Sequence, residues 1–166
     1  MATLVAFPIL GVLVILQSAV VSRIPLLHGT ADLVLIALLA WAIQERVSSA
    51  WQWSILGGLL VSLVTALPLA AILAGYLLAT GVALLLRHRV WQVRILALLI
   101  ATFFGTLITH AITVAYLRLS GTPIPLVDAF NVITLPSALL NLLVAVPLYA
   151  FIGDLANWVY PEEVEI

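Results

Sequence analysis

The side chains that could do chemistry in this chain are few and widely separated. Its 166 residues include six Arg, seven Asp or Glu and three His, but neither Cys nor Lys. Without Cys there is no thiolate to bind a metal or to act as a nucleophile. The sequence also has no HExxH, GxSxG or phosphate-binding glycine motif, and the apolar segments contain no paired carboxylates. We therefore expect no enzyme, no bound metal and no cofactor, and the net charge of −1 gives no reason to expect a nucleic-acid partner.

One apolar segment carries a stripe of hydroxyl groups beside a histidine. Four threonines are spaced four, three and four residues apart, and His110 follows the second of them by four: Thr102, Thr106, Thr109 and Thr113. This spacing keeps all five side chains on one side of a helix. Two interpretations remain open: His110 takes part in proton transfer, or the hydroxyls bond their own helix and pack between helices. We favour the second, because His110 has no acidic neighbour in the sequence.

Further polar residues lie inside or at the ends of apolar segments. Asn141 is near the middle of the last one, where hydrocarbon offers its amide no partner, so we expect it to be buried and bonded to another helix. Gln17, Ser62 and the threonine stripe are its expected partners. Asp32 stands at the start of a helical segment, where a carboxylate caps free N–H groups.

Small residues form a ridge at helical spacing. Ala71, Gly75 and Ala79 lie four residues apart, a pattern that lets another helix approach closely. The sequence leaves open whether that helix belongs to this chain or to another protein. We expect the ridge to serve as a helix-docking surface for a partner.

The polar residues described above, apart from Asp32, lie on long apolar segments that contain no charged residue. The mean hydropathy is +1.30, and the charge-free runs are Leu4–Val21, Leu33–Ile43, Ile55–Leu86, Ile95–Leu117 and Ile133–Ile152. In a bilayer every backbone polar group must be bonded internally, so runs of this length form helices. As one helix, Ile55–Leu86 would be about 48 Å long, well beyond a hydrocarbon core of about 30 Å. Pro68 near its middle therefore predicts a hairpin between two helices.

We predict an all-α fold: one integral membrane domain, 1–166, with six transmembrane helices. Their expected ranges are 3–22, 31–44, 52–66, 68–86, 93–118 and 133–154, and the loop 119–132 is expected to be non-helical. The second and third helices are short, so either the bilayer is thin there or neighbouring helices shield them.

The arginines and tryptophans predict the orientation. Both termini are expected to be cytoplasmic, because four of the six arginines then lie inside: Arg46, Arg87, Arg89 and Arg94. All the tryptophans fall on that same side and are expected to form an interfacial belt: Trp41, Trp51, Trp53, Trp91 and Trp158.

Three segments resemble a known family, the rod shape-determining protein MreD family. LQSAVVSRIPLLHGTADLVLIALLAW, from Leu16 to Trp41, resembles its opening, in which L-Q-S ends the first helix and P-D-L-x-L follows. Here Ala31 stands where proline is usual. SALLNLLVAVPLY, from Ser137 to Tyr149, resembles the last helix, with its Asn and Pro at Asn141 and Pro147.

The third segment, GGLLVSLVTALPLAAILAGYLLA from Gly57 to Ala79, resembles the family's G-L-L-x-D-L hairpin unit, with Ser62 at the acidic position. The resemblance implies a non-enzymatic scaffold of the bacterial cell-wall elongation machinery, located in the cytoplasmic membrane and surrounded by lipid. MreC is the implied partner, together with the RodA glycosyltransferase and a class B transpeptidase. It also implies a fold similar to the six-helix substrate-binding subunits of energy-coupling-factor transporters. Such a vitamin-capturing subunit is our alternative function.

Overall fold

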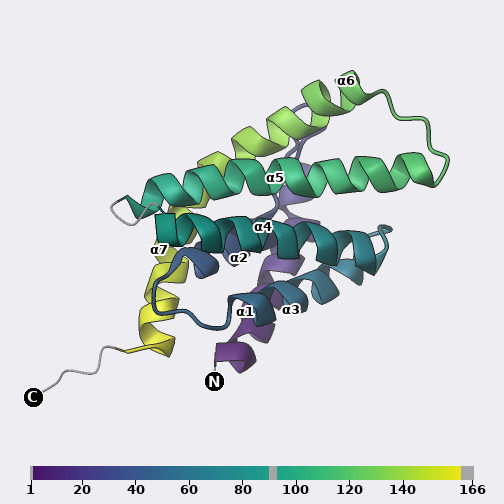
Figure 1. The fold of residues 1–166 in the computed structure, drawn as a ribbon. Helices are drawn as coiled ribbons and strands as arrows, with labels where there is room; N and C mark the ends of the chain where they lie inside the picture. The colour runs from purple at the N-terminus through teal and green to yellow at the C-terminus, as the bar shows by residue number, and fades with distance from the viewer. Residues whose placement is uncertain (1, 90–92, 162–166) are drawn as a thin grey trace, which may run out of the picture.

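The computed structural model describes residues 2–89 and 93–161 (Figure 1). These residues form helices joined by loops, with one isolated bridge between Leu26 and Gly29. The longer helices are α1 (Ala2–Ala19), α2 (Leu33–Ile43), α3 (Ala50–Ser62), α4 (Leu69–Arg89), α5 (Arg94–Leu119) and α7 (Leu135–Val159). Shorter turns are η1 (Val21–Arg23), α6 (Leu126–Asp128) and the π-helical η2 (Ala129–Thr134). The expected all-α fold is confirmed for the described residues.

Four helical segments are long and apolar enough to cross a membrane: Thr3–Arg23, Leu69–Arg89, Arg94–Leu119 and Leu126–Val159. The remaining helices, α2 and α3, have 11 and 13 residues. At roughly 1.5 Å per residue α2 is about 17 Å long, so it cannot cross a core of about 30 Å alone. The membrane character of the chain follows from the four long segments, and six crossings remain a prediction.

The short helix α2 lies at the centre of the bundle. Each of its residues from Leu33 to Ile43 is buried, and it contacts α1, α3, α4, α5 and α7 (Figure 1). Because its whole surface packs against other helices, α2 needs no amphipathic pattern. Of the two explanations for its short length, shielding by neighbours is the one that the packing supports.

The small-residue ridge packs inside the bundle, where α4 and α5 run side by side (Figure 1). A Cβ atom added to Gly75 would lie 3.1 Å from Thr109 Cγ2, and one added to Gly105 would lie 3.3 Å from Ala79 Cβ. Ala71 is half-buried at the start of the same helix. The expectation that this ridge docks a partner protein is therefore wrong for Gly75 and Ala79, because α5 already occupies their surface.

The hairpin between α3 and α4 forms where it was expected, since α3 ends at Ser62 and α4 begins at Leu69, directly after Pro68. The last helical segment differs from expectation. It begins at Leu126, not at 133, so half of the predicted loop 119–132 is helical, and it ends at Val159, not at 154. Pro125 precedes its first turn, where a missing N–H breaks no helical bond.

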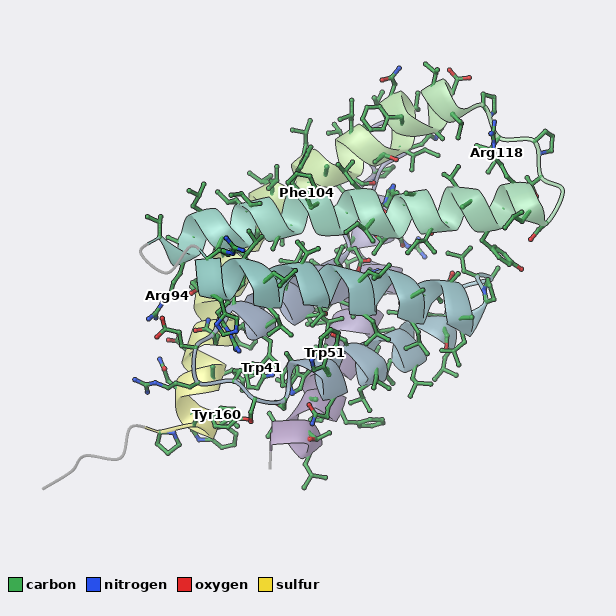
Figure 2. The ribbon with its side chains drawn as sticks, in the orientation of Figure 1. Trp41, Trp51, Arg94, Phe104, Arg118 and Tyr160 are labelled. Atoms are coloured by element: carbon green, nitrogen blue, oxygen red, sulfur yellow. The ribbon has the colours of Figure 1, made fainter. Side chains whose placement is uncertain are left out.

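The tryptophans do not form one interfacial belt. Trp41 and Trp53 are fully buried and stacked, with ring centroids 4.0 Å apart, because they lie where α2 and α3 meet. The buried Trp41 Nε1 donates to Ser49 Oγ at 3.2 Å. Trp51 and Trp158 are exposed (Trp51 is labelled in Figure 2). Trp91 lies outside the described residues.

Candidate functional site

The first turn of α2 is capped by side chains from two parts of the chain. Asp32 Oδ1 accepts from Leu35 N at 2.9 Å, so Asp32 is the helix cap that its position predicts. Gln17 Oε1 from α1 accepts from Val34 N at 3.1 Å. The first N–H groups of a helix have no partner within it, so they need acceptors from elsewhere. These two oxygens bond two of those N–H groups, those of Val34 and Leu35.

Asn141 links three helices at this point. Its side chain is 1% exposed, its Oδ1 accepts from Asp32 N at 2.7 Å, and its Nδ2 donates to Thr106 Oγ1 at 2.8 Å. The prediction that Asn141 is buried and bonded across the bundle is confirmed, with the threonine stripe as one partner. Gln17 bonds α2 instead of Asn141. Ser62 is also not a partner: it is half-buried and donates to Leu59 O of its own helix at 2.6 Å, because it sits in the last turn of α3.

The threonine stripe mostly bonds its own helix, as the second interpretation states. Thr106 Oγ1 donates to Thr102 O at 2.8 Å, and Thr113 Oγ1 donates to Thr109 O at 2.9 Å. Thr102 Oγ1 is buried without a hydrogen-bond partner among the described residues. His110 is half-buried, and its Nδ1 lies 3.2 Å from Thr134 Oγ1. The histidine therefore faces η2, and the stripe divides between helix packing and the wall of a cavity.

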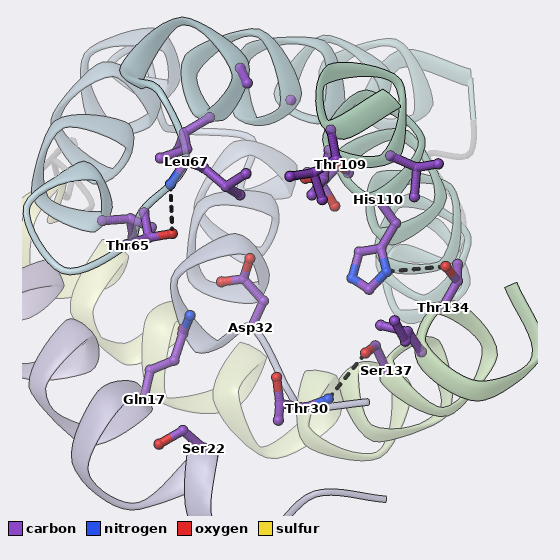
Figure 3. Close-up of a pocket in the computed structure, with 18 of the residues that line it drawn as sticks. Gln17, Ser22, Thr30, Asp32, Thr65, Leu67, Thr109, His110, Thr134 and Ser137 are labelled. Carbon is purple, nitrogen blue, oxygen red and sulfur yellow. Dashed lines mark hydrogen bonds between the residues drawn. The ribbon is translucent and has the colours of Figure 1, made fainter. Parts of the chain in front are cut away.

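This cavity has a volume of about 450 Å³ and lies beside the first turn of α2 (Figure 3). Its wall combines apolar side chains with polar groups from α1, the cap of α2, α4, α5 and the first turn of α7, among them Gln17, Asp32, Tyr76, His110, Thr113 and Ser137. Figure 3 shows Asp32 and Gln17 on one side of the space and His110 and Thr109 on the other. A volume of this size lies within the range of small-molecule sites.

The carboxylate of Asp32 faces this cavity with a tyrosine beside it. The Tyr76 hydroxyl lies 3.1 Å from Asp32 Oδ1 and 3.0 Å from Oδ2, and it donates to this carboxylate. Tyr76 is 4% exposed. Sequence reasoning missed Tyr76, although a tyrosine directly after the small residue Gly75, within an apolar segment, was a signal that its hydroxyl needs a partner.

The loop before α2 packs against α7 beside the cavity. Thr30 N donates to Ser137 Oγ at 3.1 Å. Gly29 is buried there, and a Cβ atom on it would lie 2.8 Å from Ile133 O, so only glycine lets the two backbones approach this closely.

The opposite end of α2 is held by an arginine from α4. Arg87 Nη1 donates to Ala42 O at 3.3 Å and to Gln44 O and Val47 O at 3.0 Å each. Nearby, Arg94 Nη2 forms an exposed ion pair with Glu45 Oε2 at 2.8 Å. A positive charge at the carboxyl end of a helix satisfies its free carbonyls and its dipole. The sequence alone gave Arg87 an orientation role only.

The described residues contain no group of three or more His, Asp or Glu side chains arranged to hold a metal. What the site offers is a carboxylate with hydroxyl, amide and imidazole groups around a cavity, an arrangement suited to binding. Comparisons with family models, with curated proteins and with solved structures find no match for this chain.

Proposed function

We propose that the chain is a non-enzymatic membrane scaffold of the bacterial cell-wall elongation machinery, similar to the rod shape-determining protein MreD family. In this proposal it lies in the cytoplasmic membrane with both termini inside. It binds MreC, and it acts beside the RodA glycosyltransferase and a class B transpeptidase.

One observation carries the proposal: residues from two of the resembling segments meet at the start of α2. Gln17 lies in the first segment and bonds Val34 N, while Asn141 lies in the last and bonds Asp32 N. These residues are far apart in the sequence, yet they build one hydrogen-bonded junction. A pattern that depended on apolar composition alone would not require polar residues to meet in this way.

Co-purification tests the proposal. The tagged full chain is extracted in mild detergent together with MreC encoded by the same genome, and an unrelated six-helix membrane protein with the same tag serves as control. Retention of MreC by the chain and not by the control supports the proposal. If the chain and MreC both fold but MreC does not co-purify with the chain, the proposal is wrong.

A second candidate is the substrate-binding subunit of an energy-coupling-factor type vitamin transporter. The cavity of about 450 Å³ with its polar wall favours it, because such a subunit must hold a small molecule. Purification from the native host distinguishes the two: an energising ATPase module in the eluate supports the transporter, and MreC with wall synthases supports the scaffold.

A further inference from the structure

We propose that the cavity beside α2 binds the protonated amine of an amphipathic molecule, with Asp32 as the countercharge. The inference is independent of the proposed scaffold role, since a scaffold and a transporter subunit could each hold such a molecule.

The charge balance of the cavity points to a cation. Asp32 is a carboxylate in its wall, and none of the described residues that line the cavity is Lys or Arg. Two histidines line it as well, His28 and His110, and His110 Nδ1 is already engaged with Thr134 Oγ1. The Arg94–Glu45 ion pair lies away from the cavity. Arg94 is the first residue of α5 and Glu45 follows the carboxyl end of α2, whereas the cavity lies beside the first turn of α2. The partners of the carboxylate are neutral donors, namely the side chains of Tyr76 and Gln17 and the backbone of Leu35 and Val34. A carboxylate away from water is stabilised most by an opposite charge, which a protonated ligand amine would supply.

The direction of the carboxylate agrees with this assignment. Asp32 is half-buried. One side of its carboxylate bonds the first turn of α2, and the other side faces the cavity (Figure 3). Its backbone N–H and Oδ1 are both engaged in the junction. A carboxylate has about four lone-pair positions, so a ligand ammonium would take the place of the Gln17 or Tyr76 donor and leave the bond from Leu35 N intact. A ligand amine can therefore bind without breaking the cap of α2.

The rest of the wall selects an amphipathic ligand. Opposite Asp32, the outer half of α5 contributes Val114 and Leu117 together with the hydroxyl of Thr113, and α4 adds Ile72. A polar head beside Asp32 and an apolar part along α5 match this division. In the orientation that the sequence predicts, the start of α2, the start of α4 and the end of α5 all lie on the extracytoplasmic side. The amine can therefore come from a free molecule or from an ethanolamine lipid headgroup in the outer leaflet.

The test uses two probes of the same shape and different charge, 2-phenylethylamine and 2-phenylethanol, added to the purified full chain in detergent. Thermal unfolding reports binding, because a ligand that binds only the folded state raises the midpoint. We expect the amine to raise the midpoint and the alcohol to leave it unchanged. If both probes raise the unfolding midpoint equally, the positive charge does not contribute to binding, and the proposal that Asp32 pairs with an amine is wrong.

Variants locate the binding. Asp32→Asn keeps a residue that caps helices well but removes the charge, so affinity for the amine should fall about tenfold to hundredfold. Asp128→Asn is the matched control, because Asp128 is exposed and outside the cavity wall. If Asp32→Asn does not fold, Thr113→Leu narrows the cavity instead and should also weaken binding. An unchanged response in the folded variant would refute the site.

Lipid nanodiscs identify the source of the amine. The ligand is the lipid headgroup if two results hold. The unfolding midpoint is higher in phosphatidylethanolamine discs than in phosphatidylglycerol discs, and 2-phenylethylamine no longer raises it in the phosphatidylethanolamine discs. If the amine still binds in both discs, the ligand is a free molecule. Absence of stabilisation by the amine and by phosphatidylethanolamine in every preparation would overturn the proposal, and this result is separate from whether MreC is retained.

Discussion

Replacing Asn141 with leucine should destabilise the folded bundle by about 2 kcal/mol. Leucine has the same branching and the same number of side-chain heavy atoms as asparagine, so the main loss comes from hydrogen bonds. Asn141 makes two of them, to Asp32 N at 2.7 Å and to Thr106 Oγ1 at 2.8 Å. Interhelical bonds of this kind in membrane proteins contribute about 0.6 kcal/mol each on average.

The larger part of the effect comes from the N–H group that is left behind. Asp32 N then has no acceptor at the start of α2, and a buried unsatisfied donor costs about 1–3 kcal/mol. Thr106 suffers less, because its hydroxyl still donates to Thr102 O. Together these terms give a loss of about 2 kcal/mol.

Equilibrium unfolding in mixed micelles, followed by tryptophan fluorescence, measures the change in free energy. Trp41 and Trp53 are fully buried and report on the core around α2. Asn157→Leu is the matched control, since Asn157 is exposed on the same helix and should change the stability by less than about 0.5 kcal/mol.

A double-mutant cycle with Thr106→Val isolates the bond to Asn141, with an expected coupling of about 0.6 kcal/mol. A loss below about 0.5 kcal/mol for Asn141→Leu, equal to that of its control, would refute the reasoning, because it would mean that the junction contributes nothing to stability.

Other predictions follow from the packing. Gly75→Leu should cost about 1–3 kcal/mol of stability through overpacking against α5, whereas Ala74→Leu on the exposed face should not; equal melting temperatures would refute the internal ridge. Arg87→Gln should lower the melting temperature, because one carbonyl in the last turn of α2 and two in the segment after it lose a charged donor; Arg87→Lys, which keeps the charge, should lower it less. For the predicted orientation, an impermeant thiol reagent should label Thr122→Cys from outside and Ser48→Cys only from inside, both positions being exposed; the reverse pattern would contradict it.

Local chemistry made several features predictable. The hairpin at Pro68 follows from the length of an uncharged run and the missing N–H of proline, and both can be read along the chain. The cap at Asp32 is equally local, because an acceptor before an apolar helical segment bonds N–H groups within the next turn. The burial of Asn141 followed from the absence of any alternative partner in hydrocarbon.

Features that depend on which helices are neighbours were mispredicted or missed. A tryptophan near the end of an apolar segment suits a membrane interface and a protein core equally well, so Trp41 and Trp53 were assigned to the wrong environment. Small residues at a spacing of four fit any close helix, and only the packing of α4 on α5 identifies the partner of Gly75. Tyr76 became part of the site because α4 brings its hydroxyl to Asp32.

The sequence by itself determined that this chain is built of apolar helices, where one hairpin turns and which polar groups require partners. These properties follow from backbone hydrogen bonding in hydrocarbon and from the conformations of single residues. Only the tertiary structure decided that α2 is enclosed on all sides and that a cavity opens beside Asp32. Both depend on the distances between helices remote in sequence, and these distances are set by the shapes of all the packed side chains together.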